Sequence, residues 1–284
     1  MMHLRERIVR VALYSISLLF SACLLAAETP GKDAVKILST KAGVRYGIWP
    51  DVPKSPAPLL FVLGGTIEDT LGVPYFRQCG NQLAAQGCVC VSVDMPCHGN
   101  EQRAGEPAGI EGWRYRCEQG ENIATDVAMR LSAVLDHLLE TGAVDPERIA
   151  ACGTSRGGFM AMHFAALEPR VKCVAAFAPV ADLTVLREFQ GIKERKVVDS
   201  LTLTNHADRL AGRGVWLIIG DRDDRVGTDQ TIELARRITA AALEKKVPAL
   251  VDLHVVAEPQ GHTTPAGAAE QAAVWFQQQF NSKK

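Results

Sequence analysis

Residues 148–158 read Arg-Ile-Ala-Ala-Cys-Gly-Thr-Ser-Arg-Gly-Gly, and this stretch is the most informative part of the chain. Its first half is a short apolar run typical of a buried strand, and residues 156–167 after it are predicted to form a helix. The turn between them matches the pattern G-x-S-x-G, with glycine at 153 and 157. Glycine fits such a tight turn because it has no side chain, and the turn lifts the serine hydroxyl clear of the sheet. The stretch therefore predicts a nucleophilic serine, Ser155, at the carboxyl end of a strand.

The rest of the chain alternates strands and helices around this turn. Apolar runs predict strands at 35–49, 59–63, 88–93, 148–152, 171–178, 215–219 and 249–256. Helical patterns occupy 73–86, 121–140, 156–167, 229–245 and a last segment that begins near 264. Such alternation predicts an α/β fold, a mostly parallel twisted sheet with helices on both faces. Ligands bind these sheets at the carboxyl ends of the strands, where functional residues are expected.

Composition and charge exclude several classes of protein. The chain has 284 residues, of which 47% are hydrophobic and 22% charged, as in ordinary globular proteins. Its 31 Lys and Arg against 32 Asp and Glu give a net charge of −1, which argues against a nucleic-acid partner. Neither CxxC, HExxH nor Cys/His pairs at zinc spacing are present, so no metal is expected.

The N-terminal segment has the pattern of a secretory signal peptide. Three arginines, at positions 5, 7 and 10, precede an uncharged apolar run over 11–25, and Ala26-Ala27 ends it. A membrane-spanning helix needs roughly 20 apolar residues, so we expect cleavage after Ala27, export, and no membrane span in the mature chain. An uncleaved anchor stays an alternative, as does lipidation at Cys23. Residues 28–284 are predicted to form one domain, because no repeat or linker divides them.

The cysteines fall into two groups by their surroundings. An exported protein can form disulfides. Four cysteines lie in apolar runs and are predicted to be buried hydrophobic residues: Cys88, Cys90, Cys152 and Cys173. The better candidates for disulfides are Cys79, Cys97 and Cys117, and the sequence does not say which of them pair.

A serine nucleophile needs a base and an acid, and both are available after later strands. His262 follows the last strand, just before the final helix. The strand over 215–219 is followed by three aspartates, Asp221, Asp223 and Asp224. The chain order serine, aspartate, histidine is the order expected for a hydrolase of this architecture. Asp182, after the preceding strand, is a weaker alternative acid.

With these residues the chain resembles the α/β-hydrolases, most closely the dienelactone-hydrolase and prolyl-oligopeptidase catalytic-domain group, over about residues 35–280. In that group the acid stands in a G-x-x-D-x-x-V pattern, which Gly220, Asp223 and Val226 match. The resemblance therefore implies that Asp223 is the acid. It also implies a short cap insertion and no organic cofactor.

The resemblance further implies an oxyanion hole of two backbone N–H groups. One belongs to the residue after the serine, Arg156, and the other to the loop Gly64-Gly65-Thr66, with Thr66 as the expected donor. Gly64 stands where these enzymes usually have histidine. The stretch over 94–99 is similar to their D-x-x-G-H-G sequence, with Cys97 in place of glycine. Dienelactone hydrolases use a cysteine nucleophile, whereas this chain has serine.

The substrate is the least specified part of the prediction. About thirty residues separate Asp182 from the next strand, which leaves room for a short flap and favours an open pocket for small soluble esters. Candidate substrate contacts are Gly65, Trp113 and Arg225. A peptidase acting on short peptides is the main alternative; peptidases of this group usually carry an N-terminal propeller that this sequence lacks. A binding protein on a hydrolase scaffold is a third possibility, and the oligomeric state is left open.

Overall fold

A computed structural model describes residues 33–192, 195–258 and 260–282. They belong to one compact unit of the chain. The predicted signal peptide, residues 1–27, and with it Cys23, lies outside the described residues. In the described ranges no helix is both long enough and apolar enough to cross a membrane.

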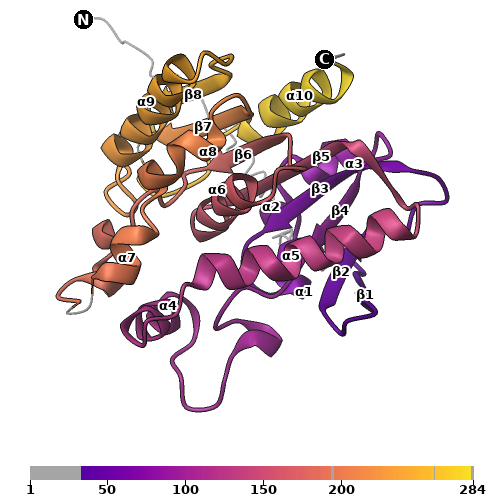
Figure 1. The fold of residues 1–284 in the computed structure, drawn as a ribbon, viewed down its shortest axis with the longest axis horizontal. Helices are drawn as coiled ribbons and strands as arrows, with labels where there is room; N and C mark the ends of the chain where they lie inside the picture. Colours follow the sequence, from indigo (N-terminus) through magenta and orange to yellow (C-terminus); the bar gives the residue numbers. More distant parts are fainter. Residues whose placement is uncertain (1–32, 193–194, 259, 283–284) are drawn as a thin grey trace, which may run out of the picture. The chain divides into compact units, whose positions relative to one another are not determined.

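An eight-stranded sheet forms the centre of this unit (Figure 1). Its strands are β1 (Lys36–Ser39), β2 (Arg45–Trp49), β3 (Ala57–Leu63), β4 (Val89–Ser92), β5 (Val144–Thr154), β6 (Cys173–Phe177), β7 (Gly214–Gly220) and β8 (Val251–Val256). Their order is β1-β2-β4-β3-β5-β6-β7-β8. The pairs β1/β2 and β2/β4 are antiparallel, and all the others are parallel. The mostly parallel sheet predicted from the sequence is confirmed.

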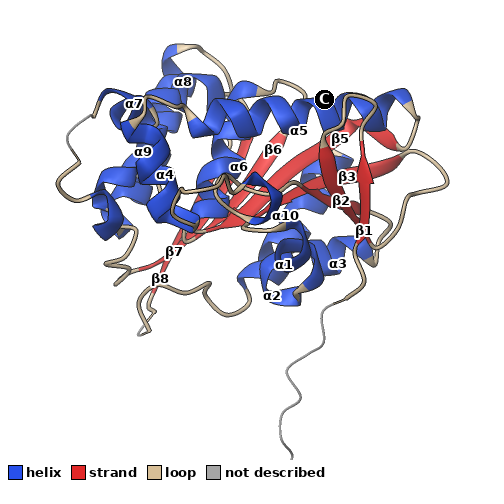
Figure 2. Cartoon of the chain, turned by 90° about the horizontal axis from the view of Figure 1, so that it is seen from below, coloured by secondary structure: helices blue, strands red, loops and turns tan. Residues whose placement is uncertain are grey.

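Helices cover both faces of the sheet (Figure 2). One face carries α1 (Ile67–Gly72), α2 (Pro74–Arg77), α3 (Gly80–Ala84) and α10 (Ala268–Asn281). The other carries α4 (Gly109–Glu118), α5 (Ile123–Glu140), α6 (Arg156–Leu167), α8 (Ala207–Leu210) and α9 (Thr228–Glu244). Every residue of β6 and β7 is buried, because both faces of these strands are covered. This is the α/β-hydrolase fold.

Helix α5 shows how the sequence pattern produces this packing. The Asn122 side chain accepts a hydrogen bond from the Thr125 N–H at 3.0 Å and caps the first turn. Along the helix, side chains at intervals of three and four residues are buried, among them Val127, Leu131 and Leu138. Burying each such aliphatic side chain contributes about 1.5–3 kcal/mol. The helix predicted over 121–140 is confirmed.

The strand order creates a crevice beside β3 and β5. After β3 the chain continues to β4 on one side of β3, and β5 then returns on the other side. The loops that follow β3 and β5 leave the sheet next to each other, and at such a switch point ligands bind in α/β sheets. Ser155 directly follows β5, and Gly64-Gly65-Thr66 directly follows β3.

Between β6 and β7 the described residues form only short helices. They are η2 (Leu183–Val185), η3 (Arg187–Phe189), α7 (Lys196–Ser200), η4 (Leu203–His206) and α8. One more 3-10 turn, η1 (Gly99–Glu101), precedes α4. The predicted cap insertion is therefore small.

The sequence did not predict helix α1, and three other segments also differ from the prediction. The helix expected over 73–86 is split into α2 and α3 at Gln78, whose φ of 49° cannot continue a helix. The stretch 95–120, expected to be irregular, contains α4. The last helix begins after Gly267, whose φ of 75° excludes an earlier start.

The prediction that Cys79, Cys97 and Cys117 are candidates for disulfides is wrong. Cys79, Cys97 and Cys117 are all buried free thiols. Burial raises the pKa of the Cys117 thiol to about 12. Cys97 lies at the position where the resembling enzymes have glycine, and its φ is 61°, a value that L side chains rarely adopt. These cysteines behave as small core residues, because packing between segments encloses them, as where Gly112 of α4 lies against Cys97.

Candidate active site

Ser155 lies on a strained turn between β5 and α6. Its φ of 55° is in the left-handed region, which a residue with a side chain enters only when its surroundings force it. The neighbouring glycines explain the constraint. A Cβ on Gly157 would collide with the Leu63 carbonyl, and a Cβ on Gly153 would collide with the Gly157 backbone. The G-x-S-x-G pattern is therefore a steric requirement of this turn.

The side chains of Ser155, His262 and Asp223 form one hydrogen-bonded chain. His262 Nε2 lies 3.0 Å from Ser155 Oγ, and His262 Nδ1 lies 2.8 Å from Asp223 Oδ2. The Asp223 side chain is buried, whereas His262 is partly exposed. If Nδ1–H donates to the carboxylate, Nε2 is left as an acceptor for the serine proton. This arrangement can activate a hydroxyl as a nucleophile.

The turn after β7 fixes the orientation of Asp223. Its Oδ1 accepts hydrogen bonds from the backbone N–H groups of Arg225 at 3.1 Å and Val226 at 3.2 Å. Oδ2 is thereby left for His262. Two of the other candidate acids bond to different groups. Asp221 Oδ1 accepts from the Glu258 N–H at 3.0 Å, and Asp182 Oδ1 caps η2 through the Thr184 N–H at 2.8 Å.

Two backbone N–H groups near the crevice have no hydrogen-bond partner among the described residues. They belong to Thr66, which caps α1, and to Arg156, the first residue of α6. The Gly65 N–H, in contrast, donates to Thr70 Oγ1 at 3.0 Å. After β3 the Thr66 N–H is therefore unpaired, whereas the Gly65 N–H is engaged; Thr66 itself is not among the described lining residues of the Ser155 pocket.

The side chain of Arg156 contributes a feature that the sequence reading missed. Its Nε donates to the Gly64 carbonyl at 2.9 Å, so the turn at Ser155 is tied to the loop Gly64-Gly65-Thr66. Burial lowers the pKa of the Arg156 guanidinium below its usual range. His98 also lies near Gly65, and its Nδ1 is 2.8 Å from the Pro96 carbonyl. Burial, reinforced by the charge of Arg156, lowers the pKa of His98. The His98 ring is thus held neutral beside the loop.

These residues open onto a pocket of about 310 Å³. Its walls include Ser155, Arg156 and His262, together with Tyr75 and Phe76 of α2. The two aromatic rings pack edge to face with their centroids 5.2 Å apart. The sequence reading did not identify them, although an aromatic pair directly after Pro74 was visible. Arg156 is the single charged side chain, apart from the titratable His262, among the described lining residues.

Two of the predicted substrate contacts occupy other positions. Trp113 has no exposed surface; it packs against Phe159 and donates from Nε1 to the Pro96 carbonyl at 2.7 Å. A side chain without exposed surface cannot contact a substrate, so Trp113 anchors α4 instead. Arg225 forms an ion pair with Glu188 of η3 at 2.8 Å. Gly65 is not among the described lining residues of the pocket either; a Cβ added there would lie 3.2 Å from Arg156 Nη2.

The described residues around the crevice do not form a metal site. No cluster of three or more His, Cys, Asp or Glu side chains occurs there. The charged residues around the crevice serve the loops instead. Asp94, for example, accepts from Arg45 Nη1 at 2.7 Å and from the Ile67 N–H at 2.8 Å.

Comparison with known proteins gives a family and a set of structures with the same fold. The sequence model of the prolyl oligopeptidase family matches residues 111–283, more than half of the chain. None of the curated proteins matches the sequence.

Among solved structures, the chain is similar to TT1662 from Thermus thermophilus, with a TM-score of 0.63 and 19% identity over 88% of this chain and 99% of that one. It is also similar to dipeptidyl peptidase 4 from Porphyromonas gingivalis, with a TM-score of 0.60 and 16% identity over 90% of this chain and 36% of that one. This chain thus spans about a third of that peptidase. A cold-adapted esterase from an Arctic intertidal metagenomic library gives a TM-score of 0.60 at 19% identity over 86% of this chain and 92% of that one.

Proposed function

The chain belongs to the prolyl oligopeptidase family and is a serine hydrolase, and from this premise we propose that it cleaves carboxylic esters of small soluble substrates with Ser155 as the nucleophile. The observation that carries the proposal is the hydrogen-bonded chain from Ser155 through His262 to Asp223, which opens onto a pocket. Neither a metal nor an organic cofactor takes part in the proposed reaction.

In the proposed mechanism His262 accepts the hydroxyl proton of Ser155 while the oxygen attacks the ester carbonyl. Asp223 holds the imidazole with Nδ1 protonated and stabilises the imidazolium that forms. The N–H groups of Thr66 and Arg156 stabilise the negative charge on the former carbonyl oxygen. His262 then gives its proton to the leaving alcohol, and an acyl-enzyme remains. Water, activated by the same histidine, releases the acid.

The charge of the pocket favours esters over peptides with a free amino terminus. A peptide with a free amino terminus carries an ammonium group, which needs a carboxylate partner when it binds in a pocket. The described lining residues include no carboxylate, and the Arg156 guanidinium would repel such a group. A pocket of about 310 Å³ with two aromatic walls suits a compact acyl or alcohol group. A small peptidase remains the alternative function, because both the family and one of the similar structures include peptidases.

The test compares initial rates on short p-nitrophenyl esters with those on aminoacyl and prolyl p-nitroanilides. Each substrate is measured with the unmodified protein, with Ser155→Ala, and with Ser200→Ala as a control for loss of an exposed hydroxyl in α7. Ester turnover that requires Ser155 and survives Ser200→Ala is the expected result. Anilide cleavage of comparable efficiency would make the protein a peptidase, and equal rates for Ser155→Ala and the unmodified protein would contradict the role of Ser155.

Export belongs to the same proposal. It is supported by the arginines and the apolar run at 11–25 that precede Ala27. N-terminal sequencing of the protein recovered from cell fractions tests it. Cleavage after Ala27 is expected, an intact Met1 would indicate an uncleaved anchor, and a modified Cys23 at the new terminus would indicate a lipoprotein.

A further inference from the structure

Strand β8 ends the sheet with an unprotected edge. It pairs with β7 on one side, and no other described strand lies on its outer side. Its six residues, Val251–Val256, contain neither proline nor glycine, and their register with β7 has no bulge. Natural proteins usually blunt such edges with proline, bulges or charged side chains, because an open edge offers its backbone to another strand; the one acidic residue of β8, Asp252, is bonded to Trp275.

The direction of the backbone groups on β8 follows from its bonds to β7. The carbonyls of Leu250 and Val256 accept from β7, so the even-numbered residues direct their N–H and C=O groups inward. Because the direction alternates along a strand, Val251, Leu253 and Val255 present theirs outward. Three consecutive outward positions are thus available for a ladder with a further strand.

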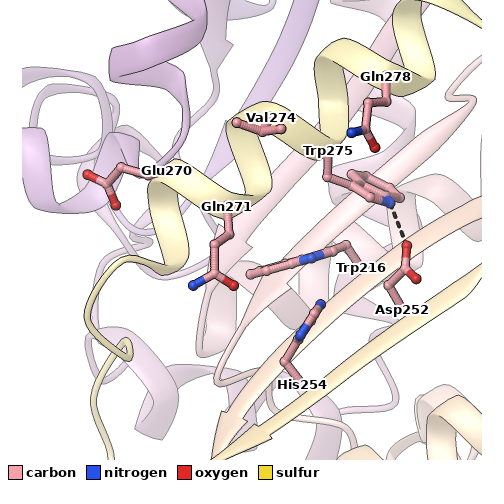
Figure 3. Close-up of a pocket in the computed structure, with 8 residues that line it drawn as sticks. All are labelled: Trp216, Asp252, His254, Glu270, Gln271, Val274, Trp275 and Gln278. Carbon is pink, nitrogen blue, oxygen red and sulfur yellow. Dashed lines mark hydrogen bonds between the residues drawn. The ribbon is translucent and has the colours of Figure 1, made fainter.

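Grooves flank β8 on both faces of the sheet. On one face, Asp252 and His254 border a groove of about 520 Å³ against α10, floored by Trp216 and closed by Trp275 (Figure 3). In it, Trp275 Nε1 donates to Asp252 Oδ2 at 2.6 Å. On the other face, Val251 and Leu253 border a groove of about 470 Å³ against α9. An added strand alternates its side chains between the two faces, so the groove on each face can receive the side chains that point toward it.

Exposed apolar side chains surround the same edge. Val255 of β8 is 42% exposed, Leu243 at the end of α9 is 67% exposed, and Val274 of α10 is 54% exposed. Leu243 and Val274 each border one of the two grooves. Large apolar side chains gathered around an unpaired edge mark an interaction surface.

We propose that β8 pairs antiparallel with β8 of a second copy of this chain, about a two-fold axis at Leu253. In this register Leu253 lies opposite Leu253, and Val251 lies opposite Val255. Each of these three pairs joins outward-directed residues that exchange two backbone hydrogen bonds, about six in all. The sheet thereby continues from one copy into the other, and α9 and α10 of each copy approach their counterparts.

The side chains of Asp252 and His254 favour the register with the axis at Leu253 and a second copy of the chain as the partner. With the axis at Leu253, Asp252 of each copy faces His254 of the other, twice, as non-hydrogen-bonded pairs, in which side chains are closest. Moving the axis to residue 252 would place two carboxylates opposite each other, and moving it to residue 254 would oppose two imidazoles. Asp252 Oδ2 already accepts from Trp275, so Oδ1 is the oxygen that faces the partner's histidine. The edge is complementary to itself.

The test uses the protein after any N-terminal processing in the cell that produces it. Its molar mass in solution is measured by light scattering at micromolar concentrations. Twice the chain mass is expected. Val255→Pro removes an outward N–H, leaves the β7 ladder intact, and should give a monomer, whereas Val255→Thr keeps the N–H and should remain a dimer. His254→Asp should raise the dimer dissociation constant on the order of tenfold, because it opposes two carboxylates twice.

The exchange variant Asp252→His with His254→Asp should restore the affinity lost in His254→Asp. If the unmodified protein is a monomer, the proposal is wrong, whether the β8 edge is unpaired or paired with another strand of the same chain. A dimer that Val255→Pro leaves unchanged would also overturn it, because the interface would lie elsewhere. Ester turnover is recorded for every variant; the residues changed lie outside the pocket of Ser155, so the assembly and the activity are tested separately.

Discussion

Replacing Asp223 by asparagine tests the orientation of the whole catalytic chain. In the structure Asp223 Oδ1 accepts from the N–H groups of Arg225 and Val226, and Oδ2 faces His262 Nδ1 at 2.8 Å. Asparagine has one acceptor oxygen, and the two backbone donors will hold it. Its amide NH₂ must then face Nδ1, which turns Nδ1 into an acceptor and moves the imidazole proton to Nε2. A protonated Nε2 cannot take the proton of Ser155.

The size of the effect follows from the loss of the correct tautomer. In serine hydrolases this replacement lowers kcat by about ten-thousand-fold, which corresponds to about 5.4 kcal/mol in activation free energy. The fold should persist, because both backbone hydrogen bonds to the side chain are kept. We expect kcat on a short p-nitrophenyl ester to fall by that order, with little change in the free energy of unfolding.

The neighbouring aspartates provide matched controls. Asp221→Asn and Asp224→Asn remove the same charge within two residues, and neither side chain bonds to His262 in the structure. Both should keep kcat within about tenfold. A kcat for Asp223→Asn within tenfold of the unmodified protein would contradict the role of Asp223, and so would a larger loss in one of the two neighbours.

Three further predictions concern the scaffold around the site. Gly157→Ala should lower the free energy of unfolding by more than about 3 kcal/mol in urea titrations, because its Cβ meets the Leu63 carbonyl; an unchanged midpoint would contradict this. Trp113→Ala should cost about 3–5 kcal/mol of stability and leave KM unchanged, since the side chain is buried; a raised KM at unchanged stability would return it to the substrate. Burial lowers the pKa of His163 to about 3, whereas the unfolded chain keeps a value near 6.5. The unfolded state therefore binds the extra proton, and stability should fall as pH falls from about 6.5 to about 3, by up to about 1.4 kcal/mol per pH unit. Unfolding curves of His163→Phe should lack this part of the slope, and an identical slope would refute the assignment.

Much of this architecture could be predicted because local pattern and tertiary fold agree. The buried strands are nearly continuous apolar runs, as in β7, and α5 carries a regular buried stripe. The turn at Ser155 could be located because its neighbours admit glycine alone. The positions that follow each strand predicted which residues the structure brings together in the crevice.

The features that escaped prediction depend on contacts between distant segments. Helix α4 contains two glycines and few apolar residues, and it is held by Trp113 on the Pro96 carbonyl rather than by its own pattern. The bond from Arg156 Nε to the Gly64 carbonyl joins residues 92 positions apart, which no local signal reveals. The thiols of Cys97 and Cys117 are similar: only the packing of α4 against the loop before it shows that both are enclosed.

Covalent labelling of the reactive serine shows whether Ser155 is the nucleophile that His262 activates. The protein is treated with a sulfonyl fluoride, and the adduct is located by peptide mass spectrometry while residual ester turnover is followed. One adduct on Ser155, formed in proportion to the loss of activity and much slower in His262→Ala, is the predicted result. An adduct at another residue, or full activity after Ser155 has been completely modified, would contradict the account.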